Sequence, residues 1–171
     1  MKHFPIYLVS ILLCFQFSCN PFAPGFDEDG LTNLNLLGDP TTIDGYFLLF
    51  QNAYELRDTS IYGRLFSENF TFTYFDFELG QEISWDRATE LNTNFNLFQA
   101  VQQINLDWNF YNVLEVNAQE DSAFVIRNFN LSVIENEQNA FSGSGRAKLS
   151  LARNGPNLPW QAYAWFDDSD F

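Results

Sequence analysis

The period of the apolar residues changes along this chain, and that change limits the folds open to it. Between residues 42 and 66, apolar side chains recur three and four positions apart, the spacing of one helix face. Most apolar residues after position 70 alternate with polar ones, the spacing of a strand. Helices gathered early and strands gathered late predict an α+β domain with helices on one face of a curved, antiparallel sheet.

Two helices are expected before the first strand. Thr42 can cap the first helix through its hydroxyl, and Asp58 or Thr59 can cap a short second helix that residues 67–69 end. The inward stripe of the first helix consists of Tyr46, Phe47, Phe50, Ala53 and Tyr54. That of the second consists of Ile61, Tyr62, Leu65 and Phe66.

The remaining chain predicts one strand, one helix and about four more strands. The first strand covers residues 70–77, a turn follows at Leu79 and Gly80, and Ser84 caps a third helix. The predicted inner face of that helix is Ala88, Leu91, Phe95 and Phe98. The later strands are expected at residues 104–110, 125–133, 141–151 and 160–166. In the first of these, alternation places Phe110 on the inner face with Ile104, Leu106 and Trp108 and turns Asp107 outward. Short polar loops at 117–121 and 135–139 suit hairpin connections.

The first eighteen residues predict a signal for export. Lys2 and His3 form a basic start, residues 4–17 are mostly apolar, and the small residue Ser18 precedes Cys19. The apolar run of about fourteen residues is shorter than the roughly 20 that a membrane-spanning helix needs. This segment resembles a bacterial lipoprotein signal, which implies that Cys19 is lipidated and becomes the new N-terminus. Cys14 is the weaker candidate because it follows a bulky leucine.

The resemblance implies a lipid-anchored protein of the bacterial cell envelope, expected at the outer membrane and facing the periplasm or the surface. An ordinary signal peptide with an incidental cysteine is the alternative. Residues 19–40 contain prolines, glycines and acidic residues without apolar periodicity, which predicts a flexible acidic tether. The expected organisation is therefore a signal peptide at 1–18, a tether at 19–40 and one domain at 41–171.

The charge of the chain excludes several classes of function. There are 22 acidic and 8 basic residues, a formal net charge of -14, so a nucleic-acid partner is not expected. The one histidine, His3, lies in the predicted signal peptide. No metal-spaced cluster, phosphate-binding glycine loop or G-x-S-x-G motif is present. We expect neither a metal nor a cofactor.

Three stretches resemble the NTF2-like superfamily, which includes the SnoaL-like proteins and the ketosteroid isomerases. They are FQNAYELRDTSIYGRLFSENFTFTYFD (50–76), SWDRATEL (84–91) and PWQAYAWFDD (159–168). The resemblance implies a cone, in which a strongly curved antiparallel sheet wraps around a long N-terminal helix and two further helices. A pocket at the open end of such a cone would be the default binding site.

The isomerase branch carries a tyrosine on the helix and a carboxylate on the first strand, and both do proton chemistry. The corresponding positions here are Phe50, which has no hydroxyl, and Tyr74, a poor base because the pKa of a tyrosine is about 10. We therefore expect a domain that binds a small apolar ligand or a protein partner without catalysis. The alternative is a SnoaL- or isomerase-type enzyme that uses a carboxylate or tyrosine instead of histidine. A buried carboxylate hydrogen-bonded to a tyrosine deep in the cone would favour that enzyme.

Six residues are the candidate lining of the pocket. They are Phe50, Tyr54, Tyr74, Trp85, Trp108 and Arg127. Core packing is the alternative role for the aromatic residues. Arg127 shares a strand face with Val125 and Phe129, so it is either an edge residue that reaches water along its stem or a cation that holds an acidic ligand.

The last strand predicts association. Trp160, Tyr163 and Trp165 occupy both of its faces, so some aromatic surface must be exposed or covered by a partner. A homodimer through the outer face of the sheet is one expectation. A purely structural envelope component that works through this face is another.

Overall fold

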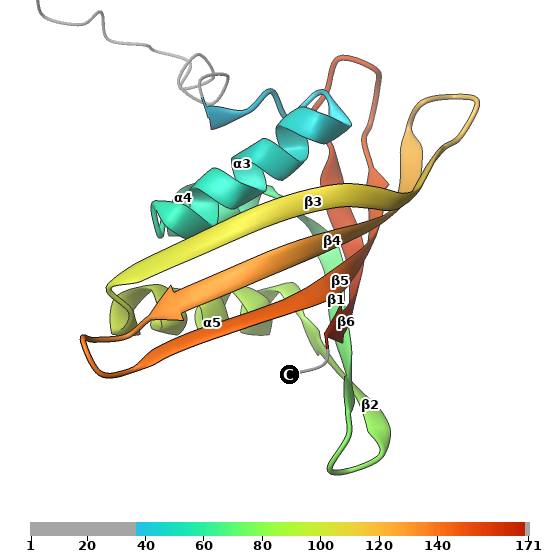
Figure 1. The fold of residues 1–171 in the computed structure, drawn as a ribbon. Coiled ribbons are helices and arrows are strands. Elements are labelled where there is room, and N and C mark those ends of the chain that lie inside the picture. The colour runs from blue at the N-terminus through green and yellow to red at the C-terminus, as the bar shows by residue number, and fades with distance from the viewer. Residues whose placement is uncertain (1–36, 170–171) are drawn as a thin grey trace, which may run out of the picture.

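The computed structural model describes residues 37–169 (Figure 1). The predicted signal peptide, Cys19 and all but the last four residues of the predicted tether lie outside this range. The helices are α3 (Ile43–Glu55), α4 (Thr59–Arg64) and α5 (Arg87–Ala100). The strands are β1 (Phe66–Asp76), β2 (Gln81–Asp86), β3 (Gln103–Val116), β4 (Ser122–Ile134), β5 (Ala140–Ala152) and β6 (Gln161–Ser169).

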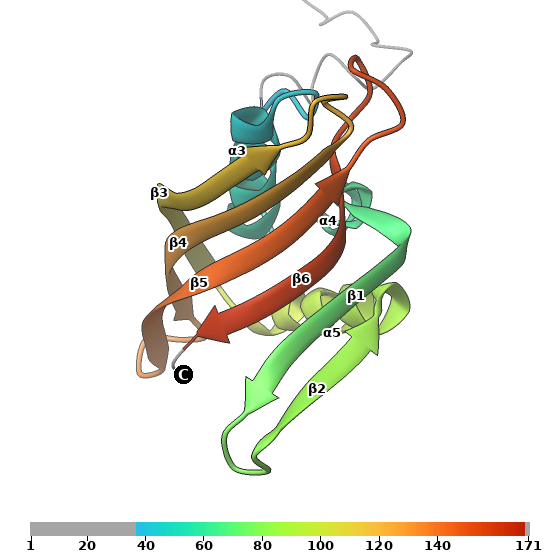
Figure 2. The same cartoon turned by 90° about the vertical axis from the view of Figure 1, so that its right-hand side faces the viewer.

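The six strands form one sheet in the order β2-β1-β6-β5-β4-β3. Neighbouring strands are antiparallel, except that β1 and β6 run parallel. The sheet curls around the helices, with α3 against β3 at one side and α5 against β1 and β2 at the other (Figures 1 and 2). This arrangement confirms the predicted α+β cone.

The first two helices begin where the sequence predicts. The side chain of Thr42 accepts a hydrogen bond from the backbone N–H of Gly45 at 3.0 Å. Asp58, rather than Thr59, caps α4 by accepting from the backbone N–H groups of Ser60 and Ile61. The predicted inward stripes of both helices are buried. The short α4 does not end at residues 67–69, because β1 already begins at Phe66.

A strand that the sequence analysis missed precedes α5. Residues Gln81–Asp86 form β2 and pair with β1, so Ser84 lies in a strand opposite Thr73 and does not cap a helix. The cap of α5 is Asp86, which accepts from the backbone N–H of Thr89 at 2.9 Å. Stacking of Trp85 on Phe72, with ring centroids 4.5 Å apart, favours this hairpin over a longer helix.

The inner face of α5 also differs from the prediction. Phe98 is buried as predicted, but Ala88 is exposed and Phe95 is 48% exposed. Glu90 and Asn94 are buried instead, at 2% and 5% exposure. A helix can bury such side chains only when their polar atoms find partners, and both residues find them inside the cone.

An irregularity in β3 moves one aromatic side chain outward. Ile104 and Leu106 are buried, and Asp107 is exposed as predicted. The register of β3 against β4 shifts between Trp108 and Tyr111, so Tyr111 packs against the core and Phe110 is 68% exposed. The predicted inward position of Phe110 is therefore wrong.

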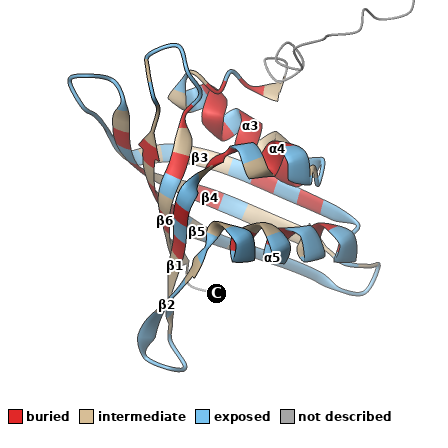
Figure 3. Cartoon of the chain, turned by 180° about the vertical axis from the view of Figure 1, so that it is seen from behind, coloured by how far each residue is buried: buried red, intermediate tan, exposed pale blue. Residues whose placement is uncertain are grey.

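The core fills the space between the helices and the concave face of the sheet (Figure 3). Trp160 and Trp165 are buried, whereas Tyr163 is 40% exposed. Among residues 37–169, no helix is long and apolar enough to cross a membrane. The same range contains no group of three or more side chains that could hold a metal ion.

Candidate functional site

The interior of the cone brings the predicted aromatic residues into one network. Phe50 is 1% exposed and stacks on Tyr54, with ring centroids 5.3 Å apart. Its ring also meets the edges of Trp108 and Trp165 at 5.4 and 5.5 Å. Phe50 therefore occupies the centre of the packed interior.

Tyr74 and Trp85 continue this network toward the edge of the sheet. Both are half-buried, and their ring centroids lie 5.5 Å apart. Phe72 joins them to the centre because it contacts Trp85 at 4.5 Å and Trp165 at 5.0 Å. Tyr74 and Trp85 are thus the more accessible end of a continuous aromatic wall.

Arg127 lies on the inner face, under the N-terminal half of α3. Its guanidinium carbon lies 4.8 Å from the ring centre of Phe47 and 4.3 Å from that of Tyr111. The guanidinium donates to the carbonyl of Asn109 at 2.9 Å and to the hydroxyl of Tyr111 at 3.0 Å. These contacts support the role of a packed, half-buried cation. Its role as a cation for a ligand stays a prediction.

A buried carboxylate lies among these rings. Oε1 of Glu90 accepts from the hydroxyl of Tyr62 at 2.5 Å and from Nδ2 of Asn94 at 2.7 Å. Oε2 accepts from Nε1 of Trp85 at 2.6 Å, and Tyr54 donates to Oδ1 of Asn94 at 2.7 Å. Side chains from α4, α5 and β2 therefore meet at this single carboxylate, and Tyr54 of α3 joins them through Asn94.

The surroundings of Glu90 disfavour its charge, but its donors offset part of the effect. Burial raises the pKa of Glu90, while the hydrogen bonds from Tyr62, Trp85 and Asn94 act to lower it. Burial also raises the pKa of Tyr62 and of Tyr54 well above the usual range. Both phenols are therefore neutral donors at neutral pH.

A second carboxylate, that of Asp167, lies nearby on the inner face of β6. It stands opposite Tyr74 in the sheet and accepts a hydrogen bond from the Ser169 hydroxyl at 2.5 Å. Burial raises the pKa of Asp167, and its charge contributes to the raised pKa of Glu90. Within the described part of the chain, Asp167 has no ion-pair partner.

Sequence reasoning missed Glu90, Asn94, Asp167 and the role of the Tyr62 hydroxyl. The four-residue spacing of Glu90, Asn94 and Phe98 was a usable signal, because these positions share a helix face. Strand alternation likewise places Asp167 on the same face as Trp165. The prediction built the inner face of the helix from its apolar residues alone, Ala88, Leu91, Phe95 and Phe98, and therefore overlooked the polar ones.

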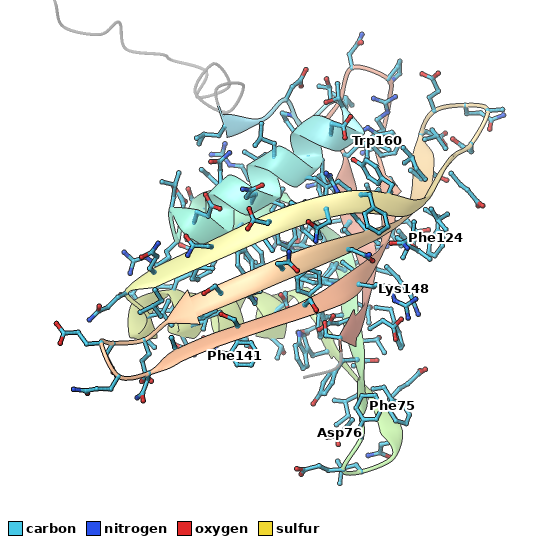
Figure 4. All side chains as sticks on the ribbon, in the orientation of Figure 1. Phe75, Asp76, Phe124, Phe141, Lys148 and Trp160 are labelled. Atoms are coloured by element: carbon cyan, nitrogen blue, oxygen red, sulfur yellow. The ribbon has the colours of Figure 1, made fainter. Side chains whose placement is uncertain are left out.

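A separate cleft of about 660 Å³ lies outside the aromatic interior, where the β5–β6 loop meets the start of β1. Buried Leu49, Leu65 and Trp160 contribute to its wall. Trp160 lies near the N-terminal end of α3 (Figure 4). None of the six predicted pocket residues lines this cleft. Their lining of a ligand pocket stays a prediction.

Comparison with known proteins identifies the fold but gives no sequence relative. No family model matches the chain, and no curated protein matches it. An NTF2-like protein from Rhodospirillum rubrum, of unknown function in nutrient uptake, superposes with a TM-score of 0.60 at 17% identity, covering 76% of this chain and 99% of that one. An NTF2-like superfamily protein from Salmonella enterica gives a TM-score of 0.56 at 14% identity, covering 72% and 85%.

Enzymes are also among the similar structures. A hexachlorocyclohexane dehydrochlorinase (LinA, type 2) superposes with a TM-score of 0.59 at 10% identity, covering 81% of this chain and 90% of that one. The chain thus has an NTF2-like fold, as its sequence resemblance predicts. Because the fold carries both enzymes and proteins of unknown function, activity must be argued from the residues of this chain.

Proposed function

We propose that this chain is a bacterial envelope lipoprotein whose NTF2-like domain binds a small, largely apolar ligand without transforming it. The observation that carries the proposal is the cleft of about 660 Å³ beside Trp160. Its volume lies within the range of small-molecule sites, and it combines apolar walls with a few polar groups.

The packing of the interior supports binding outside it. Phe50, at the position of the catalytic tyrosine in the isomerases, is 1% exposed and surrounded by rings. Glu90 is 2% exposed and its carboxylate accepts hydrogen bonds from three side chains. A base needs a free lone pair within reach of its substrate, and burial together with these three contacts leaves little of Glu90 accessible.

Binding can be tested on full-length protein extracted from membranes. Native mass spectrometry should detect a co-purified small molecule, and Leu158→Asn should reduce its occupancy. Leu158 lines the cleft and is 48% exposed, so the substitution removes apolar contact without disturbing the core. Unchanged occupancy in this variant would place the ligand elsewhere.

The anchor rests on Ser18, Cys19 and the acidic stretch that follows them. The lipoprotein resemblance implies more than one lipid chain on Cys19, which suffices for stable anchoring, whereas a single chain is marginal. We expect Cys19→Ser to lack acyl mass and to leave the membrane fraction, while Cys14→Ser keeps both properties. Unmodified Cys19 in membrane-extracted wild-type protein would contradict the anchor.

A second candidate function, acid–base catalysis, is favoured by one specific observation. The pair formed by Glu90 and Tyr62 is a buried carboxylate hydrogen-bonded to a tyrosine, the feature expected of a histidine-free enzyme of this fold. Complementation of a deletion strain separates the candidates. If Glu90→Gln, at wild-type protein level, loses the phenotype while Leu158→Asn retains it, catalysis is favoured over binding in the cleft.

We also propose self-association through the outer face of the sheet. Phe124 (Figure 4) is 39% exposed between the buried residues Ala123 and Val125, so it faces away from the helices. Its partner Ser150 pairs with Ala164, the neighbour of Tyr163, which is 40% exposed. Exposed aromatic surface of this kind is common where proteins associate. Sedimentation should give a dimer that Phe124→Ser weakens, and a strictly monomeric wild type would exclude it.

A further inference from the structure

We propose that the ligand of the cleft beside Trp160 is an amphipathic anion and that Arg64 binds its carboxylate or similar head group. This inference rests on the proposed function, since it names the class of molecule that the cleft takes. It follows from the charge of the lining, the free donors of Arg64 and the apolar wall.

Arg64 is the available cation of this cleft. It lies in the last turn of α4, is exposed, and its backbone carbonyl accepts from Nε2 of Gln161 at 3.2 Å. Its guanidinium makes no hydrogen bond or ion pair with any residue in 37–169, although its charge helps to lower the pKa of Asp58. The other cations in that range donate to carbonyls, a hydroxyl or carboxylates; they are Arg57, Arg87, Arg127, Arg146, Lys148 and Arg153.

Arg153 adds a second, fixed positive charge. Its guanidinium lies 4.3 Å from the ring centre of Trp160 and donates to the carbonyls of Thr41 and Pro156 at 2.9 and 2.6 Å. These acceptors are neutral, so they hold the guanidinium in place without cancelling its charge. The carboxylate of Glu120 is 3.8 Å away and 70% exposed, where an ion pair is weak.

The lining of the cleft is positive although the chain is acidic. Among residues 37–169, Glu68 is the one acidic residue of the lining, and its side chain is 93% exposed and 3.8 Å from Arg87. Two arginines and one glutamate give the lining a formal charge of +1, against -14 for the whole chain. This local reversal of sign favours an anion over a cation or a neutral ligand.

The rest of the lining determines the body of the ligand. Leu65 and Trp160 present buried apolar surface, and Leu158 and Tyr163 are 48% and 40% exposed at the edge. A guanidinium binds a carboxylate through two parallel hydrogen bonds. An apolar body with one anionic group therefore matches both parts of the cleft.

The test uses lipidated full-length protein in nanodiscs of phosphatidylcholine, with empty discs as the blank. The probes are 2-naphthylacetate and its uncharged amide, 2-naphthylacetamide, and calorimetry measures both affinities. We expect the acid to bind up to about fivefold more tightly than the amide, because an ion pair at an exposed arginine contributes at most about that factor. Arg64→Gln should remove this preference, and Arg146→Gln, a matched loss of one exposed charge outside the cleft, should retain it.

The outcomes separate the inference from the proposed function. The anion inference is wrong if acid and amide bind equally to wild type, or if Arg64→Gln keeps the preference for the acid. If Leu158→Asn weakens the binding of both probes in that case, binding in the cleft still stands. If neither probe binds at millimolar concentration, or Leu158→Asn has no effect on either, both proposals fail.

Discussion

The hydroxyl of Tyr62 lies 2.5 Å from Oε1 of Glu90, and this contact joins α4 to α5 inside the core. The two residues are 28 positions apart in the sequence, and both are almost fully buried. A hydrogen bond to a carboxylate contributes more than one to a neutral acceptor, and losing this bond would leave Glu90 with only the donors of Trp85 and Asn94. The position of α5 therefore depends on a polar contact as well as on apolar packing.

Removing one hydroxyl tests this dependence. We expect Tyr62→Phe to lower the free energy of unfolding by about 1.5–3 kcal/mol, because Glu90 loses its shortest donor. Tyr46→Phe is the matched control, since Tyr46 is equally buried but donates to the neutral carbonyl of Leu65 at 3.3 Å. Its expected cost is at most about 1 kcal/mol. Equal losses in urea denaturation would contradict a special role for the contact with Glu90.

The raised pKa of Glu90 predicts a pH dependence of stability. A carboxyl whose pKa is higher in the folded than in the unfolded state binds its proton more tightly when the protein is folded. The contribution of Glu90 to stability therefore falls as the pH rises from the ordinary pKa of 4.5 through the raised pKa. Glu90→Gln cannot titrate. We therefore expect the free energy of unfolding of the wild type, minus that of Glu90→Gln, to fall as the pH rises across this window. A difference that is constant with pH would show that Glu90 keeps its ordinary pKa.

Asp58 predicts the opposite dependence on pH. Burial acts to raise its pKa, but hydrogen bonds from Ser60 and Ile61, together with the charge of Arg64, outweigh burial and lower it. Its contribution is present above the ordinary value of 3.8 and is lost as pH falls through the lowered pKa. Asp58→Ala should cost about 1 kcal/mol at neutral pH through the lost cap of α4.

Asp58→Asn is the control for that cap. It retains an acceptor for the backbone N–H groups at the start of α4 and should recover most of the stability at neutral pH. Unlike wild type, it should show no loss from this position on acidification. Chemical denaturation at neutral and acidic pH measures both effects, and identical losses in the alanine and asparagine variants would argue against capping.

The sequence predicts the parts of the fold that local chemistry determines. Thr42 and the apolar stripe from Tyr46 to Tyr54 suffice to place α3, because the cap and the helical period agree. The long strands are predictable from a local pattern as well, because their apolar residues alternate with polar ones. Ser84 misled the prediction because a hydroxyl before a helical pattern normally indicates a cap, whereas pairing of Trp85 with Phe72 makes this segment a strand.

The candidate site was less predictable, because its key residues are polar side chains in apolar positions. Glu90 and Asn94 are stable in the core only because Tyr62, Trp85 and Tyr54 reach them from other elements. No local pattern contains those partners. The cleft is similarly non-local, since Arg64, Arg153 and Trp160 come from distant parts of the chain.

A close backbone approach at the start of α3 gives the last prediction. A Cβ placed on Gly45 would lie 2.0 Å from the carbonyl oxygen of Asp39, an atom of the turn that precedes the helix. Backbone cannot yield as a flexible side chain can, so we expect Gly45→Ala to destabilise the fold by about 1–3 kcal/mol.

Gly63→Ala is the same substitution in a site with room. Its Cβ would meet the side chain of Leu91 at 3.8 Å, an ordinary contact, and alanine favours a helix such as α4 over glycine by up to about 1 kcal/mol. Thermal unfolding should therefore show a lower midpoint for Gly45→Ala and an unchanged or higher one for Gly63→Ala. Because Pro40 and Thr41 follow Asp39 and contact Trp160 and Arg153 through their carbonyls, the Gly45 variant should also weaken binding in the cleft. A Gly45→Ala variant as stable as wild type would mean that the segment before α3 is free to move away from the helix.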